Sequence, residues 1–79
     1  MRISMDDLRY LLKELNELTS EDKYPYVFYM AYGSYGLDKI INDSRGARTI
    51  ISLTTKKDLY YQMRAFISGI YAEKERNEK

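Results

Sequence analysis

The sequence contains neither cysteine nor histidine. Without cysteine there is no disulfide and no thiolate metal site, and without histidine the usual nitrogen ligand of zinc is missing. The same two absences remove the commonest general base and the best thiol nucleophile. No P-loop, dinucleotide-binding, nucleophile-elbow or calcium-loop motif takes their place. We therefore predict that the chain is not an enzyme and that it binds neither a metal nor a cofactor.

Long apolar runs are missing as well. No stretch of about 18 apolar residues exists, so no membrane span is expected. The N-terminus turns acidic at Asp6 and Asp7 and lacks the apolar stretch of a signal peptide. The absence of cysteine fits a reducing compartment, and we expect a cytoplasmic protein. Its 79 residues are enough for one domain. We place this domain at 1–72, followed by a charged tail at 73–79 that frays.

What the sequence has in abundance is tyrosine, with nine residues of this type. Tyrosine offers a large contact area with few rotatable bonds, and its hydroxyl group can stay in water at the rim of a contact. It also serves as an ordinary strand residue. A domain of this size has a thin margin of stability, and the missing disulfides and metals leave tight packing or a partner chain to supply the rest.

Two segments have the apolar spacing of amphipathic helices. In residues 5–18 the apolar positions cover an arc of about 140°. Ser4 caps this segment, with Asp7 at the capping-box position. A second helix begins after Thr55, where Thr55 and Asp58 have the same capping form. Its expected core face consists of Leu59, Tyr60, Met63, Phe66, Ile67, Ile70 and Tyr71.

The middle of the chain predicts strands and turns. Residues 26–32 are aromatic or aliphatic throughout, which is typical of a strand, with Tyr26, Phe28, Met30 and Tyr32 on one face. Residues 33–36 contain two glycines and favour a hairpin turn over a phosphate-binding loop. Residues 37–42 fit either a strand or a single helical turn, and we adopt the strand. Residues 47–53, after a turn at 42–46, are rich in β-branched side chains.

These segments give the order α-β-β-β-α. The predicted fold class is α+β, with a small antiparallel three-stranded sheet and both helices packed on one of its faces.

One candidate binding surface is a stripe of small residues on the outer side of the last helix. Small side chains at this spacing let a second backbone come close, although alanine and serine are also harmless on any exposed helix. With the tyrosines that the helix patterns leave outside the core, the predicted partner-binding residues are Tyr10, Tyr35, Tyr61, Ala65, Ser68 and Ala72. They would bind a protein partner or a second copy of the chain.

The second candidate is the basic stretch 45–64, which has five basic residues against the single acid Asp58. The basic residues are Arg45, Arg48, Lys56, Lys57 and Arg64. A helix N-terminus already offers unpaired N–H groups to an anion, and two lysines there add charge that a phosphate backbone would meet. The simpler explanation for these basic residues is that they solvate an exposed face. Two lysines at a helix N-terminus are, however, mildly unfavourable for the helix dipole, so solvation alone does not select them.

Two resemblances accompany these patterns. The order α-β-β-β-α with Lys56 and Lys57 opening the last helix is similar to the double-stranded-RNA-binding domain, in which basic residues at this position contact phosphates. The Gly-Pro-X-His loop of that family is absent. The tyrosine-, isoleucine- and lysine-rich style resembles short uncharacterised proteins of Gram-positive bacteria and their phages, which implies a regulatory or accessory protein. We expect a non-enzymatic module that acts by protein–protein interaction, with nucleic-acid binding through 45–64 as the alternative.

Overall fold

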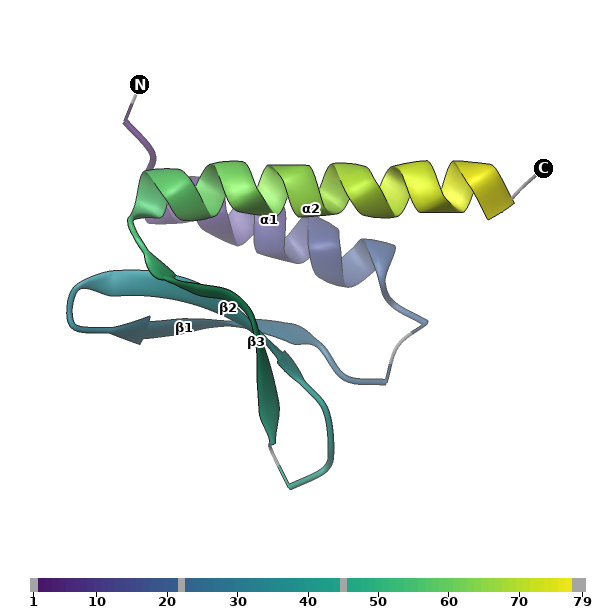
Figure 1. The fold of residues 1–79 in the computed structure, drawn as a ribbon, viewed down its shortest axis with the longest axis horizontal. Coiled ribbons are helices and arrows are strands. Elements are labelled where there is room, and N and C mark those ends of the chain that lie inside the picture. The colour runs from purple at the N-terminus through teal and green to yellow at the C-terminus, as the bar shows by residue number, and fades with distance from the viewer. Residues whose placement is uncertain (1, 22, 45, 78–79) are drawn as a thin grey trace.

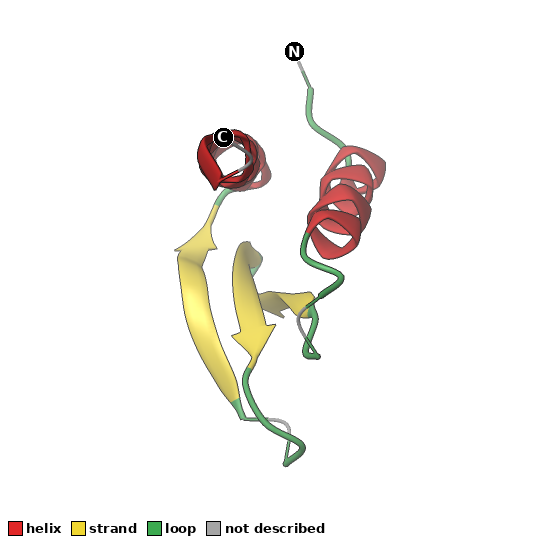
Figure 2. Ribbon diagram, turned by 90° about the vertical axis from the view of Figure 1, so that its right-hand side faces the viewer, coloured by secondary structure: helices red, strands yellow, loops and turns green. Residues whose placement is uncertain are grey.

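The computed structural model describes residues 2–21, 23–44 and 46–77. It contains two helices and three strands in the order α1 (Met5–Leu18), β1 (Tyr26–Ala31), β2 (Ser34–Ile40), β3 (Ala47–Thr54) and α2 (Lys56–Asn77). The strands form one antiparallel sheet in the order β1-β2-β3. Figure 2 shows α1 and α2 side by side on one face of this sheet. The predicted α+β architecture is therefore confirmed.

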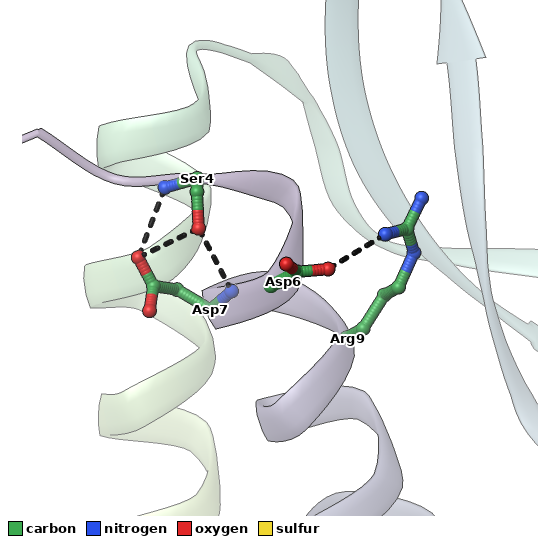
Figure 3. Close-up of polar contacts among 4 residues, drawn as sticks. All are labelled: Ser4, Asp6, Asp7 and Arg9. Atoms are coloured by element: carbon green, nitrogen blue, oxygen red, sulfur yellow. Dashed lines mark hydrogen bonds and ion pairs between the residues drawn. The ribbon is translucent and has the colours of Figure 1, made fainter.

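Helix α1 begins where the sequence predicts. The Ser4 Oγ accepts a hydrogen bond from the Asp7 backbone N–H at 3.3 Å, and the Ser4 N–H donates to the Asp7 carboxylate at 2.9 Å (Figure 3). This reciprocal pair satisfies donors that the first turn of a helix leaves open. The ion pair between Arg9 and Asp6, also drawn in Figure 3, is exposed and contributes little to stability.

The core lies between the helix pair and the inner face of the sheet. Leucines of α1 meet Leu37 of β2, Ile51 of β3 and the apolar stripe of α2. The residues with buried side chains are Ile3, Leu8, Leu11, Leu15, Tyr26, Leu37, Ile51, Leu59, Met63 and Ile67. Among the described residues, none beyond Ile67 is buried, because the C-terminal end of α2 runs on past the sheet (Figure 1).

The hairpin between β1 and β2 turns at Tyr32 and Gly33, one residue earlier than predicted. Both residues have positive φ angles, 54° and 73°. A two-residue turn of this kind matches the right-handed twist of the two strands. Tyr32 therefore belongs to the turn and not to the face of β1, and Tyr35 and Gly36, which we expected in the turn, are part of β2.

Strand β2 settles the choice that the sequence left open for 37–42. Residues 37–40 are strand, paired on one side with β1 and on the other with β3. A turn follows, closed by a 2.8 Å hydrogen bond from the Ile41 N–H to the Gly46 carbonyl. Helix α2 includes residues 73–77, which the sequence places in the charged tail. Residues 78–79 lie outside the described residues.

Asn16 of α1 connects the helix layer to the outer edge of β1. Its side-chain amide donates to the Tyr26 carbonyl at 3.1 Å, and its oxygen accepts from the Tyr26 N–H at 2.8 Å. The side chain thus supplies both bonds that a neighbouring strand would have made to Tyr26. This contact fixes where α1 lies relative to the sheet.

Replacing Asn16 by alanine is expected to lower the free energy of unfolding by about 1–2 kcal/mol, because two partly buried hydrogen bonds are lost. Urea denaturation of the wild type and the variant measures this loss. The matched control is Lys13→Ala on the same helix, where an exposed side chain is removed. We expect a change of less than about 0.5 kcal/mol there. Equal effects at the two positions would show that the Asn16 amide does not hold the layers together.

Candidate interaction surface

The two helices leave a shallow groove along the side where they meet. They run in the same direction, and the Tyr71 hydroxyl donates to the Glu14 carboxylate at 3.3 Å while the Lys74 ammonium donates to the Leu18 carbonyl at 2.7 Å. Two hollows of about 330 and 190 Å³ lie along the groove, and both are lined by Leu11, Glu14 and Arg64. The groove is therefore continuous along the helix pair.

Tyrosines surround this groove. Tyr10 of α1 is 70% exposed, and Tyr61 and Tyr71 of α2 are 47% and 46% exposed. Tyr60 is partly buried and lines the 330 Å³ hollow, and its ring meets that of Tyr61 edge to face with centroids 5.5 Å apart. We call the exposed region formed by Tyr10, Glu14, Tyr60, Tyr61, Arg64 and Tyr71 the interhelical surface.

Arg64 lies at the centre of the interhelical surface. Its guanidinium carbon is 5.7 Å from the centroid of the Tyr60 ring, within the range of a cation–π contact. The side chain is exposed, and the ion pairs of the described residues do not include it. An arginine that is already held over an aromatic ring loses little conformational freedom when a ligand contacts it.

Tyr71 of this surface has a hydroxyl with a raised pKa. Partial burial, followed by the negative charge of Glu14 that accepts its hydrogen bond, raises the pKa of the Tyr71 hydroxyl above its ordinary value. The neutral hydroxyl therefore continues to donate to Glu14 at a pH where an isolated tyrosine would ionise. The contribution of this contact to stability is complete below about pH 10 and is lost as the pH rises further.

We expect Tyr71 to ionise at a higher pH than an exposed tyrosine, because the raised pKa protects its proton. Alkaline titration followed by ultraviolet absorbance should show that Tyr71→Phe removes a late-titrating component. Glu14→Gln should move this component toward lower pH. The control Tyr32→Phe changes a tyrosine that is 99% exposed and should leave the late-titrating component in place. The contact would be disproved if Glu14→Gln left the titration unchanged.

The predicted partner-binding residues divide among three places. Tyr10 and Tyr61 belong to the interhelical surface, and Ser68 lines its smaller hollow. Ala65 lines a third hollow of about 540 Å³ on the other flank of α2, with Phe66, Gly69 and Ile70, and Ala72 is exposed. The small-residue stripe thus forms the ridge between two hollows. Tyr35 lies elsewhere: it is half-buried in β2, packed against the core.

Five residues of the predicted core face of α2 line these hollows: Tyr60, Phe66, Ile67, Ile70 and Tyr71. The helix is 22 residues long, so its C-terminal part passes beyond the sheet, and only Leu59, Met63 and Ile67 are buried. Periodicity alone gives the direction of an apolar face and not the length over which another layer covers it. The length of the helix, compared with strands of six to eight residues, was the signal that the sheet would not cover all of α2.

The predicted basic residues do not form one patch. Arg48 lies near the start of β3 and Lys56 follows its end, and the six residue steps from Arg48 to Thr54 span about 20 Å. Lys56 extends over the Tyr35 ring, with 5.7 Å between the ammonium and the ring centroid. Lys57 is exposed on the first turn of α2. Arg45 lies outside the described residues.

The N-terminus of α2 already has acceptors of its own. The Thr55 Oγ accepts from the Asp58 N–H at 3.1 Å, as the predicted cap requires. The Asp58 carboxylate accepts from the Thr54 hydroxyl at 3.3 Å and brings a negative charge to the same turn. A phosphate at this position would therefore find the Asp58 N–H already bonded to Thr55, and the negative charge of the Asp58 carboxylate would repel it.

Other sites are sparse in the part of the chain that the structure describes. No group of three or more carboxylates, histidines or cysteines is placed to hold a metal ion there. Neither helix, within the described ranges, combines the length and the apolar character of a membrane span. Asp38, on the outer face of the sheet between Val27 and Thr49, has a buried Oδ1 for which the described residues supply no hydrogen bond.

The chain matches no protein-family model, no curated protein and no solved structure. The resemblances to the double-stranded-RNA-binding domain and to short phage proteins therefore stay predictions.

Proposed function

We propose that this chain is a non-enzymatic protein-binding module, a small regulatory or accessory protein that contacts its partner through the interhelical surface. The observation that carries the proposal is the gathering of Tyr10, Tyr60, Tyr71 and Arg64 along one exposed groove, with Tyr61 beside it in ring contact with Tyr60. Tyrosine and arginine are enriched among residues that dominate binding energy in protein interfaces. Aromatic side chains also lose few degrees of freedom when they are covered.

The geometry suits a polypeptide ligand. The groove has an apolar floor at Leu11 and Ile67, which are buried, and the exposed tyrosines Tyr10 and Tyr71 beside it. Its charged members differ in sign: Asp7 and Glu14 are acidic, with Glu14 accepting from Tyr71, and Arg64 is basic and exposed. A partner segment with aliphatic side chains and a carboxylate would fill the groove and pair with Arg64.

Nucleic-acid binding has less support. Its predicted contacts are separated by the length of β3, and the residues that flank Arg64 across the groove include Asp7 and Glu14. Acidic side chains on this side would repel a phosphate backbone. The net charge of the chain is only +1.

The two functions can be separated with matched double variants of the tagged full chain, purified from the organism that encodes it. Tyr10→Ser with Tyr61→Ser removes two exposed rings of the interhelical surface. Lys56→Glu with Lys57→Glu reverses charge at the start of α2. We expect a specific protein to co-purify with the wild type and the lysine variant and to be lost, at least roughly tenfold, from the tyrosine variant.

Repeating this experiment at raised salt concentration separates the two functions a second time. Binding through tyrosine and aliphatic contacts should persist when the salt concentration is raised severalfold, whereas binding to phosphates falls steeply. Recovery of nucleic acid that is lost at high salt and in the lysine variant would contradict the proposal. So would a partner that remains bound to the tyrosine variant.

A further inference from the structure

Strand β1 lies at one edge of the sheet, and part of this edge is unpaired. In a hairpin with a two-residue turn, the residues that flank the turn exchange hydrogen bonds, and every second residue does so thereafter. Ala31, Tyr29 and Val27 therefore bond to β2 in the observed register. The N–H and C=O groups of Tyr26, Phe28 and Met30 point the other way, toward the free edge.

Tyr26 and the other two residues differ in what meets them there. The Asn16 side chain occupies both groups of Tyr26. The hydrogen bonds that the described residues form do not reach the edge-facing groups of Phe28 and Met30. The N–H and C=O groups of Phe28 and Met30 are thus open to a partner strand, whereas Asn16 closes the edge at Tyr26.

From Phe28 to Ala31, this edge lacks the usual protection against pairing. Edge strands commonly carry charges, prolines or bulges that prevent contact with another chain. About one third of all residues in this chain are charged, yet residues 24–37 include no charged residue at all. Tyr29, Met30 and Tyr32 are nevertheless 49%, 57% and 99% exposed. An uncharged, apolar and open edge of this kind is a template for a further strand.

We propose that β1 pairs with β1 of a second copy of this chain, antiparallel, to form one continuous six-stranded sheet. Phe28 lies opposite Met30 of the second copy, and Met30 opposite its Phe28. The two-fold axis passes beside Tyr29, which faces itself across the axis. This is the register in which all four open groups on each copy find partners without displacing Asn16.

Self-complementarity is the reason to choose a second copy as the occupant. In a two-fold interface each residue near the axis meets its own counterpart, so a charged residue there would meet a like charge. The uncharged stretch 24–37 satisfies this condition, whereas a different partner would not require it. Because the donors and acceptors alternate along the edge, the strand also complements itself in hydrogen bonding.

The available area reaches the size of a small specific interface. An aromatic side chain covers about 150–250 Å² when it is buried. With Tyr32 almost fully exposed and Tyr29 and Met30 about half exposed, these three side chains offer on the order of 400 Å² per copy. Two copies together with their strand backbones approach about 1,000 Å², the lower bound for a specific interface. The dimer is therefore expected to be stable but not obligate.

The pairing uses none of the residues of the interhelical surface. Self-association through β1 and partner binding through the helices are consequently independent, and either one can fail without the other.

Light scattering and sedimentation of the purified full chain, at concentrations up to about 1 mM, test the pairing. We expect a monomer–dimer equilibrium that raised salt does not dissolve. Amide exchange should slow at Phe28 and Met30 as the concentration rises, because their N–H groups become bonded. Tyr29→Lys places two lysines across the axis, about 5 Å apart at the backbone, and should weaken the dimer at least roughly tenfold.

A second variant examines the backbone directly. Met30→Pro removes an N–H group that faces the free edge, so β1 keeps its bonds to β2 and the fold is retained, as circular dichroism should show. The dimer should be lost. The control for Tyr29→Lys is Tyr10→Lys, which replaces a 70% exposed tyrosine on α1 by lysine. This control should leave the dimer intact. A wild type that stays monomeric, or a dimer that survives both Tyr29→Lys and Met30→Pro, would overturn the proposal.

Discussion

Replacing Leu37 by alanine is expected to lower the free energy of unfolding by about 3 kcal/mol. Leu37 lies in the central strand, and its side chain is completely buried between the helices and the sheet. The cost combines lost burial of apolar surface with the cavity that remains. A core of this size rarely supplies more than about 3–5 kcal/mol, so a large part of the variant chain should be unfolded at room temperature.

Circular dichroism and urea denaturation measure this effect, and the sheet itself provides a control of the same residue type. Leu53 lies in β3 and is 38% exposed, so Leu53→Ala should cost less than about 1 kcal/mol. A loss at Leu53 as large as that at Leu37 would show that the two leucines are equally covered. The described packing, with the core on the helix side, would then be wrong.

Replacing Gly36 by alanine is expected to destabilise the chain by about 1–3 kcal/mol, although alanine adds only one methyl group. A Cβ at this position would lie 2.8 Å from the Ile51 carbonyl oxygen of β3. The register between β2 and β3 shifts on either side of Leu37, so the two backbones approach closely here. Backbone cannot move aside as a flexible side chain can.

Gly69 is the matched control for Gly36. It lies in the exposed part of α2, where an added Cβ meets nothing within 4 Å. Gly69→Ala should therefore stabilise the chain by up to about 1 kcal/mol, because alanine favours helix more than glycine does. Thermal denaturation should move in opposite directions for the two variants. Stabilisation by Gly36→Ala would contradict the close approach of β2 to β3.

The parts of the fold that could be predicted from the sequence depend on local physics. The apolar spacing of residues 5–18 and the cap formed by Ser4 and Asp7 involve neighbours in the chain, and both are confirmed. The β-branched and aromatic stretches likewise correspond to strands. With helices at both ends and three strands between them, few arrangements other than two helices on one face of a meander remain.

The turn between β1 and β2 shows why local rules were insufficient. Tyrosine rarely adopts a positive φ angle, so its presence argued against a turn at Tyr32. The pair of glycines at Gly33 and Gly36 suggested that both were needed for the turn. In the structure Gly33 has the positive φ, whereas Gly36 allows the approach of Ile51, a residue fifteen positions later. Such a requirement depends on strand register and has no local signal.

The candidate site was predicted in part. Tyr10 and Tyr61 fell on the polar sides of their predicted helices, and both are exposed as that placement implies. The proximity of Tyr10 to Tyr60 and Arg64 required the parallel arrangement of α1 and α2, which periodicity does not specify. Arg48 and Lys56 are near each other in sequence, but the extended strand between them separates them in space.

Photo-crosslinking in the organism that encodes the chain tests the protein-binding function most directly. A photoreactive residue in place of Tyr61 probes the interhelical surface, and one in place of Thr49, which is exposed on the opposite side of the sheet, serves as the matched control. We predict that position 61 yields a discrete crosslinked protein of different sequence and that position 49 does not. Equal products from both positions, or crosslinks from position 61 to nucleic acid alone, would contradict the proposed function.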